Sequence, residues 1–196
     1  MGKVLHIDPW AYVFGAFLVL TVPLDWLVGA LVAAVVHELS HIVAIRSVGG
    51  SILDIHIGIG GAVIDSHIPG KGRELLCALA GPAGSLLLVS LCRVYPKLAI
   101  CGLIQGSFNL LPVFPLDGGR ILRCLLVLVC PMTHERISRC VERLVIVFLI
   151  LLAVAGTFCC SMGFLPIVVG MVLIIKKKTL QSKLNQGTIV LPFVKR

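Results

Sequence analysis

The chain has 196 residues, of which 58% are hydrophobic and 13% are charged, and its mean hydropathy is +1.07. A chain of this length cannot bury that much apolar surface in one soluble core, so these values exclude a soluble globular protein and predict an integral membrane protein. The net charge of +8 does not indicate a nucleic-acid partner, because the basic residues gather in short segments between apolar runs, as membrane topology signals do. The lipid bilayer is the expected partner.

Apolar segments recur along the whole chain and predict a single membrane domain. The first predicted span is 10–24, and Trp10, Tyr12 and Trp26 in and after it suit the aromatic belt at the membrane surface. A cleaved signal peptide is an alternative for this segment. The uncharged segment 144–175 would form a helix well longer than the ~30 Å hydrocarbon core, so it is either two spans that turn near 161–163 or one long tilted helix. The other predicted spans are 27–45, 75–92 and 98–111.

The basic residues distinguish between these two topologies. With six spans and a cytoplasmic N-terminus, only Arg93 and Lys97 of the 17 lysines and arginines lie on the outer side. A single last helix would place the cluster at 176–178 on the outer side, so the charge distribution favours six spans with both termini in the cytoplasm. The residues predicted on the cytoplasmic side are Lys3, Arg46, Lys71, Arg73, Arg120, Arg123, Arg136, Arg139, Arg143, Lys176, Lys177, Lys178, Lys183, Lys195 and Arg196.

Two segments between the spans have patterns of their own. After the second span, isoleucines alternate with His56 and Gly58, and glycines 60 and 61 suit a turn, so residues 52–64 are predicted to form a β-hairpin. After the fourth span, the two prolines and two glycines of LPVFPLDGGR oppose a regular helix. The predicted fold is an all-α polytopic membrane protein with about six transmembrane helices and a membrane-associated β-hairpin after the second.

The second span contains the stretch VVHELSH at 35–41, in which three ionisable residues lie in an apolar segment. On a helix, His37 and His41 are one turn apart and project from the same face, so two imidazoles can reach one metal ion. Glu38 can then accept a proton from the attacking water, which is the HExxH arrangement of zinc metalloproteases. The alternative is a polar helix face whose histidines are satisfied by hydrogen bonds, but ionisable residues inside a span usually have a function.

A zinc site normally takes three protein ligands, and Asp117 is the candidate for the third. It is an acidic residue in an apolar neighbourhood just after the fourth span. The second and fourth spans are predicted to run in the same direction, so His41 and Asp117 can meet near the cytoplasmic half of the membrane. An aspartate before two glycines usually braces a turn, and the HExxH motif in the same chain favours the ligand over that alternative.

Three motifs together resemble a known family: HELSH in one span, ALAGPAGS in the next and NLLPVFPLDGG after a third. They are similar to the site-2 protease family of intramembrane zinc metalloproteases, in particular the bacterial branch typified by the stage IV sporulation protease FB. The resemblance covers about residues 28–123 and implies that His37, His41 and Asp117 bind zinc and that Glu38 is catalytic. It also implies that Asn109 positions the substrate or stabilises the oxyanion, the alternative being an amide that packs between helices.

The same resemblance implies a protease domain over 1–178, with its catalytic core at about 24–130, and a short cytoplasmic tail at 179–196. The substrate would be a membrane-embedded or membrane-tethered protein of a bacterial inner or cell membrane, such as a transcription-factor precursor processed by regulated intramembrane proteolysis during sporulation. Membrane-protein regulators are possible further partners. The hairpin at 52–64 fits the binding of an extended substrate segment by strand addition. Ser85 departs from the family pattern, because relatives often carry Asn there.

Two other classes of function are compatible with parts of the sequence. A metal transporter would also place His and Asp inside the membrane, but it needs no Glu beside the first ligand and is expected to have polar residues along several spans. The last two predicted spans lack such residues. A catalytically inactive membrane scaffold would keep the fold, but here the predicted ligands and Glu38 are all present.

Overall fold

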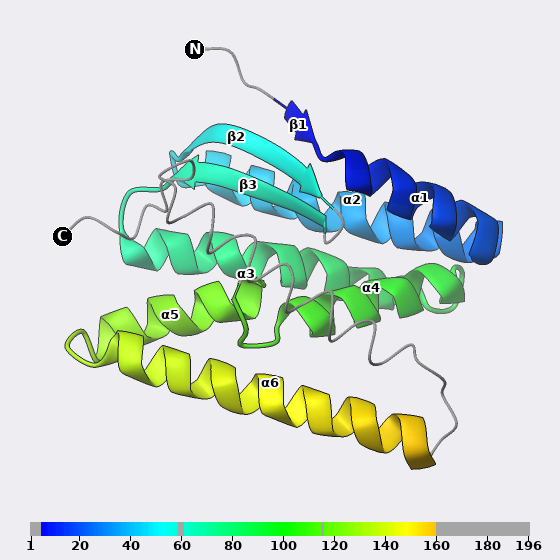
Figure 1. The fold of residues 1–196 in the computed structure, drawn as a ribbon. Coiled ribbons are helices and arrows are strands. Elements are labelled where there is room, and N and C mark those ends of the chain that lie inside the picture. Colours follow the sequence, from blue (N-terminus) through cyan, green and yellow to red (C-terminus); the bar gives the residue numbers. More distant parts are fainter. Residues whose placement is uncertain (1–4, 59–60, 115, 160–196) are drawn as a thin grey trace. The chain divides into compact units, whose positions relative to one another are not determined.

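The computed structural model describes residues 5–58, 61–114 and 116–159, and the chain divides into two compact units at Leu110. The described part of the first unit contains β1 (Leu5–Ile7), α1 (Pro9–Thr21), α2 (Leu24–Ser47), β2 (Ser51–Gly58), β3 (Gly61–His67), α3 (Lys71–Leu87), the short 3-10 helix η1 (Leu88–Leu91) and α4 (Pro96–Asn109). The described part of the second contains α5 (Asp117–Val129) and α6 (His134–Cys159). Figure 1 shows these elements along the chain.

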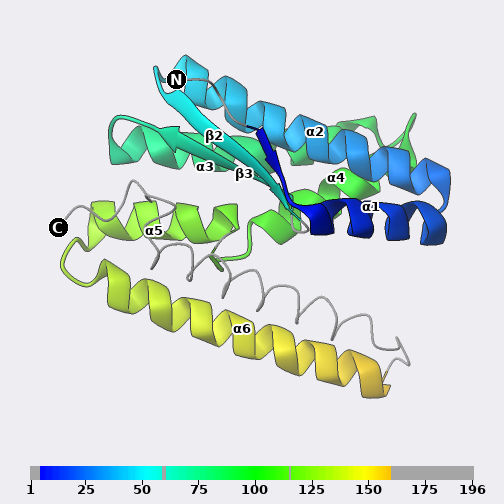
Figure 2. The same ribbon diagram turned by 45° about the horizontal axis from the view of Figure 1, so that its top comes forward.

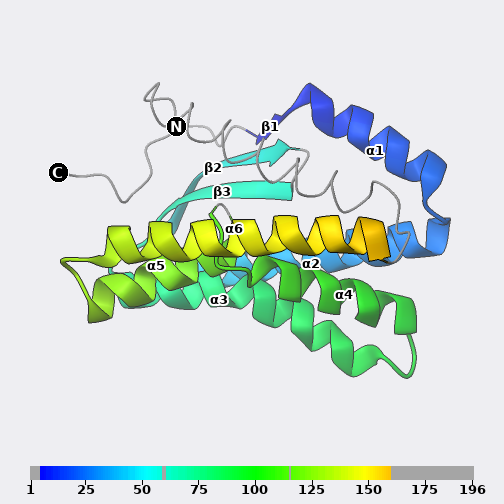
Figure 3. The ribbon, with the colours of Figure 1, turned by 60° about the horizontal axis from the view of Figure 1, so that its bottom comes forward.

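In the first unit, α2, α3 and α4 pack against one another in all three pairs. Figure 3 shows the sheet and α1 on one side of this group of helices. Glycines allow close approach at the contact between α3 and α4, since a Cβ at Gly102 would lie 2.6 Å from the carbonyl oxygen of Ser85 and one at Gly106 would lie 3.2 Å from Ser85 Cβ. The helices are therefore held by small-residue contacts, which are typical of helix association in membranes.

The predicted hairpin is confirmed by the antiparallel pairing of β2 with β3, in which Gly58 pairs with Gly61. Gly61 is thus the first residue of β3, and residues 59 and 60 lie outside the described residues. The sequence did not predict β1, which pairs in parallel with β2 and makes a sheet with the order β1-β2-β3. A strand of three residues is too short to produce a recognisable alternation of apolar and polar side chains.

A Schellman motif ends α2 and turns the chain into β2. The amide of Gly50 donates to the carbonyl of Ile45 at 2.8 Å, and the amide of Gly49 donates to the carbonyl of Arg46 at 3.1 Å. Gly49 has a φ of 78°, a left-handed conformation that glycine adopts without strain. The hairpin therefore starts at a fixed place relative to the last turn of α2.

The surface of α2 is the reverse of that of a soluble helix. Large apolar side chains face outward, with Leu31 64% and Val43 66% exposed, whereas two histidines are buried. In a soluble protein the apolar stripe of a helix is buried and the polar residues are exposed. The exposed face of α2 suits contact with lipid. Its buried residues recur every four positions: Gly29, Ala33, His37, His41 and Ile45.

Among the described residues, α2 and the stretch Lys71–Leu91 are long and apolar enough to cross a bilayer, while the apolar part of α1 is shorter. These two correspond to the second and third predicted spans, and the structure is that of a mostly helical membrane protein. The fifth predicted span begins inside α6, which starts at His134 rather than near 144. The sixth lies outside the described residues, so the number of passes and the side of each terminus stay predictions.

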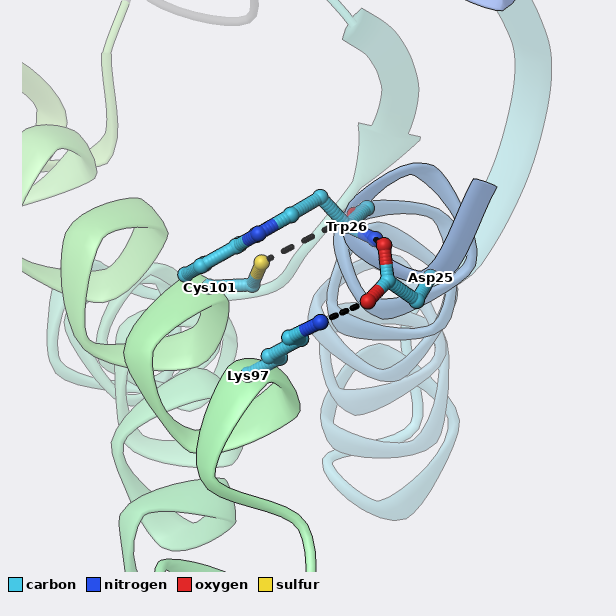
Figure 4. Close-up of polar contacts among 4 residues, drawn as sticks. All are labelled: Asp25, Trp26, Lys97 and Cys101. Atoms are coloured by element: carbon cyan, nitrogen blue, oxygen red, sulfur yellow. Dashed lines mark hydrogen bonds and ion pairs between the residues drawn. The ribbon is translucent and has the colours of Figure 1, made fainter. Parts of the chain in front are cut away.

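Polar contacts join the N-terminal ends of α2 and α4 (Figure 4). The Lys97 ammonium pairs with the Asp25 carboxylate and lies 5.8 Å from the centre of the Trp26 ring. The Cys101 thiol donates to the backbone carbonyl of Trp26 at 3.9 Å. Because Asp25 and Lys97 are about half exposed, such an ion pair contributes at most about 1 kcal/mol. The packing of α2 on α4 is therefore the larger stabilising contribution.

The described part of the second unit differs from one prediction, that for the segment LPVFPLDGGR. The prediction of irregular backbone through LPVFPLDGGR is wrong at its end, because Asp117 is the first residue of α5. Both prolines precede the helix, so they do not interrupt its hydrogen bonds. The positive N-terminal end of a helix favours a carboxylate, here that of Asp117, in its first turn. Gly119 lets the preceding loop lie close, since a Cβ there would be 2.7 Å from the backbone of Val113. Figures 1 and 2 show α5 and α6 as an antiparallel pair.

Candidate metal centre

His37 and His41 lie on the buried face of α2, as the sequence predicts. Their side chains are 3% and 6% exposed. Their ring centres are 4.9 Å apart, and the two rings are nearly perpendicular, at 82°. The two imidazoles are therefore neighbours in a protected part of the first unit, at the spacing that one turn of helix provides.

The ring of His41 is oriented by the main chain of α3. Its Nδ1 atom lies 2.8 Å from the backbone carbonyl oxygen of Cys77. A carbonyl can only accept a hydrogen bond, so Nδ1 donates and Nε2 carries the lone pair. This tautomer is the one in which Nε2 can bind a metal ion, and an outer hydrogen bond of this kind is typical of metal-binding histidines.

Gly81 allows the His41 ring to lie against α3. A Cβ built on Gly81 would collide with the His41 ring, with Nε2 as its nearest atom. The second glycine of the AGPAGS motif, Gly84, similarly lies against Ser40 of α2. The small residues of this motif thus allow α3 to approach α2 closely. The sequence did not reveal that the contact includes a predicted metal ligand.

The ring of His37 is oriented by a side chain rather than by the backbone. Its Nδ1 atom lies 2.8 Å from the hydroxyl oxygen of Ser85, which is completely buried on α3. Ser85 therefore makes a polar contact with the first histidine of the motif. The pair is separated by 48 positions in the chain, so no local pattern predicts it.

The remaining predicted site residues lie at three places in the chain. Glu38 is half-buried and follows His37 directly on α2. Asn109, the last residue of α4, donates its side-chain amide to the carbonyl of Gln105 at 3.1 Å. Asp117 is buried in the first turn of α5. Since Asp117 belongs to the second unit and the histidines to the first, its part in the same site stays a prediction.

The residues of α2 fit a zinc ion by their chemistry. Zinc takes imidazole nitrogen and carboxylate oxygen as ligands, and catalytic sites combine three such groups with one open position. His37 and His41 offer two nitrogens, both with the outer hydrogen bonds that orient such rings. Because position 81 has no side chain, the His41 ring can lie against α3 in this orientation. The predicted third group, the Asp117 carboxylate, completes a set of the expected type.

Comparison with known proteins agrees with this geometry. Residues 80–154 match the sequence profile of Peptidase family M50. The profile match covers less than half of the chain. A zinc metalloprotease of Methanocaldococcus jannaschii is 40% identical to this chain over 110 residues, which are 48% of the chain and 32% of that protein. The protein Rip3 of Mycobacterium tuberculosis is 34% identical over 128 residues, which are 52% of the chain and 32% of Rip3.

The chain also shares its fold with a solved structure. The site-2 protease from Methanocaldococcus jannaschii superposes with a TM-score of 0.66 and 22% sequence identity, over 100% of this chain and 95% of that one. The matched part of the chain spans about a third of the length of the two sequence relatives. The structural likeness establishes the fold.

Proposed function

We propose that this chain belongs to Peptidase family M50, the site-2 protease family, and is a zinc-dependent intramembrane endopeptidase that hydrolyses a peptide bond in a membrane-embedded or membrane-tethered protein. The observation that carries the proposal is the pair of buried histidines in HELSH, whose Nδ1 atoms are both held by α3. Asp117 is the proposed third ligand, Glu38 the proposed general base and Asn109 the proposed contact to the substrate or oxyanion. The name of the archaeal relative, a zinc metalloprotease, supports the same metal and reaction.

The proposed reaction is hydrolysis, in which the C–N bond of the peptide breaks and the oxygen of water bonds to the acyl carbon. Zinc, when bound, supplies a Lewis acid that polarises the scissile carbonyl and lowers the pKa of a water. Glu38 accepts a proton from the attacking water and returns it to the leaving amine, so the products are an acid and an amine. Its position one residue after His37 puts this carboxylate on the helix that carries two ligands.

The sheet supports binding of the substrate as an extended strand. One edge of β2 is covered by β1 and the other by β3, so β3 is an edge strand of the sheet within the described residues. An extended peptide can add to such an edge through main-chain hydrogen bonds.

We place the protease in a bacterial inner or cell membrane, with six spans, both termini in the cytoplasm, a domain over 1–178 and a short tail. Its substrate class is a membrane-tethered precursor, such as a transcription factor released during sporulation.

Metal removal tests the proposal. The wild-type chain is co-expressed with a panel of single-span and membrane-tethered candidate substrates, and membranes are examined for a shortened product. Treatment with 1,10-phenanthroline is expected to abolish cleavage and added Zn²⁺ to restore it, because the chelator removes the Lewis acid. The non-chelating 1,7-phenanthroline is the control. Cleavage that persists without metal contradicts a zinc protease, and a zinc-loaded chain that cuts none of the panel favours the inactive scaffold or the transporter.

Replacing Asp117 tests the third ligand. Asp117→Asn is expected to weaken zinc binding by more than the 10–100-fold that loss of an outer contact causes, since a neutral amide is a poor zinc ligand. Affinity is measured by competition with a chelating dye on detergent-purified protein. The matched control is Asp25→Asn, because Asp25 is likewise an aspartate in the first turn of a helix. Equal zinc affinities of the two variants would exclude Asp117 from the ligand set.

A further inference from the structure

We infer that Ser85 is a positioning residue that holds His37 in the orientation needed to bind zinc, so that its hydroxyl sets how tightly the site binds the metal. The inference rests on the zinc centre proposed above. Ser85 is 0% exposed, and its hydroxyl oxygen lies 2.8 Å from Nδ1 of His37. No step of the proposed reaction uses Ser85, yet its hydroxyl contacts a predicted metal ligand.

The two histidines are held in different ways, and this difference singles out Ser85. His41 bonds to a backbone carbonyl, which the helix itself keeps in place. His37 bonds to a hydroxyl, which both donates and accepts and can rotate about its own bond. When Nε2 of His37 binds a metal, Nδ1 carries the proton and the Ser85 oxygen accepts it. Removing the Ser85 hydroxyl removes this acceptor, whereas no side-chain substitution removes the Cys77 backbone carbonyl that accepts the hydrogen bond from His41.

Contacts with α4 explain how a single hydroxyl can be held firmly enough for this role. The backbone of α4 approaches Ser85 closely at Gly102 and Gly106, where added Cβ atoms would lie 2.6 Å from the Ser85 carbonyl oxygen and 3.2 Å from Ser85 Cβ. α3 thus presents Ser85 to His37 on one side and is backed by α4 on the other. The orientation of the first histidine depends in this way on the packing of all three helices.

The experiment compares Ser85→Ala with Ser40→Ala. Ser40 is the matched control because its hydroxyl lies in the same contact between α2 and α3 but donates to the carbonyl of Val36 at 2.7 Å and not to a histidine. Zinc affinity is measured by dye competition, the ligand geometry by the visible absorption of the Co²⁺-substituted protein, and the fold by the melting temperature of the metal-free protein. Ser85→Ala is expected to weaken zinc binding by about 10–100-fold and to alter the Co²⁺ spectrum. Ser40→Ala is expected to do neither.

A hydroxyl-bearing variant completes the test. Ser85→Thr is expected to bind zinc more tightly than Ser85→Ala, because it restores the acceptor. If the added methyl group prevents folding against α4, Ser85→Asn replaces it, since its amide oxygen also accepts. Wild-type affinity and spectrum in Ser85→Ala, or equal weakening in Ser40→Ala, would overturn the role of Ser85. A wild-type chain that binds no zinc would instead overturn the proposed function itself, so the two failures are distinguishable.

Discussion

Cleavage by the Glu38→Gln variant is expected to fall by about 10²–10⁴-fold, the usual contribution of a general base, while zinc is still bound. Glutamine has nearly the shape of glutamate, but its neutral amide cannot accept the proton of the attacking water. The predicted ligands His37 and His41 are unchanged, and so are the contacts of their rings with α3. The measurement is the rate of product formation in the co-expression assay, at matched expression and with zinc content determined on the same preparations.

The charge-matched control for this variant is Glu74→Gln. Glu74 is a buried glutamate, whereas Glu38 is half-buried, and it lies in the first turn of α3 and pairs with Lys71 at 3.3 Å. It is expected to keep wild-type cleavage, which separates the loss of a base from the loss of a buried negative charge. Wild-type cleavage by Glu38→Gln would show that Glu38 is not the base. Loss of zinc from that variant would instead indicate a structural role for Glu38 in the metal site.

The second large effect is expected from a single added methyl group. Gly81→Ala places a Cβ against the His41 ring, closest to Nε2. Either the ring turns away and loses its bond to the Cys77 carbonyl, or α3 moves away from α2. We expect zinc affinity to fall by about 100-fold or more, the upper end of the effect of losing an outer contact to a metal ligand. We also expect the free energy of unfolding to fall by about 1–3 kcal/mol, as it does when an interior is overpacked. Dye competition and urea unfolding of the metal-free protein measure the two effects.

Two other glycines of α3 provide the controls for Gly81→Ala. A Cβ at Gly72 would meet nothing within 4 Å, so Gly72→Ala is expected to keep zinc affinity and to stabilise the helix slightly. A Cβ at Gly84 would collide with Ser40, so Gly84→Ala is expected to destabilise the contact between α2 and α3 with a smaller loss of zinc. If Gly81→Ala and Gly84→Ala weaken zinc binding equally, the effect comes from helix packing and not from the space beside His41.

The local features of the fold were predictable because they depend on neighbouring residues. The spacing of His37 and His41 in an apolar segment predicted a helix with both rings on one face, and α2 has that arrangement. The alternation of isoleucines predicted the hairpin that β2 and β3 form. The start of α5 at Asp117 was missed, because the prolines and glycines around it were interpreted together, although the prolines precede the helix and the glycines lie in its first turn.

The partners of the two histidines could not be predicted, because they are distant in the chain. Cys77 and Ser85 are 36 and 48 positions away from the histidines they contact. The sequence shows that the segment around Gly81 contains small residues, and small residues allow a close approach without identifying the helix that approaches. Which helices meet, and in what register, is decided by the packing of the whole first unit.

The backbone acceptor of His41 has a consequence for how the protein can diverge. A main-chain carbonyl is present whatever residue occupies position 77, so mutations there preserve the bond provided that the new side chain fits a site that is only 2% exposed. At position 85 the bond depends on the side chain itself. We therefore expect a small residue at position 77 to be sufficient for the bond to His41, whereas the bond to His37 requires a side chain with a hydrogen-bonding group at position 85. The hydrogen bond that orients His41 therefore does not depend on the side chain at position 77, whereas the one that orients His37 depends on the side chain at position 85.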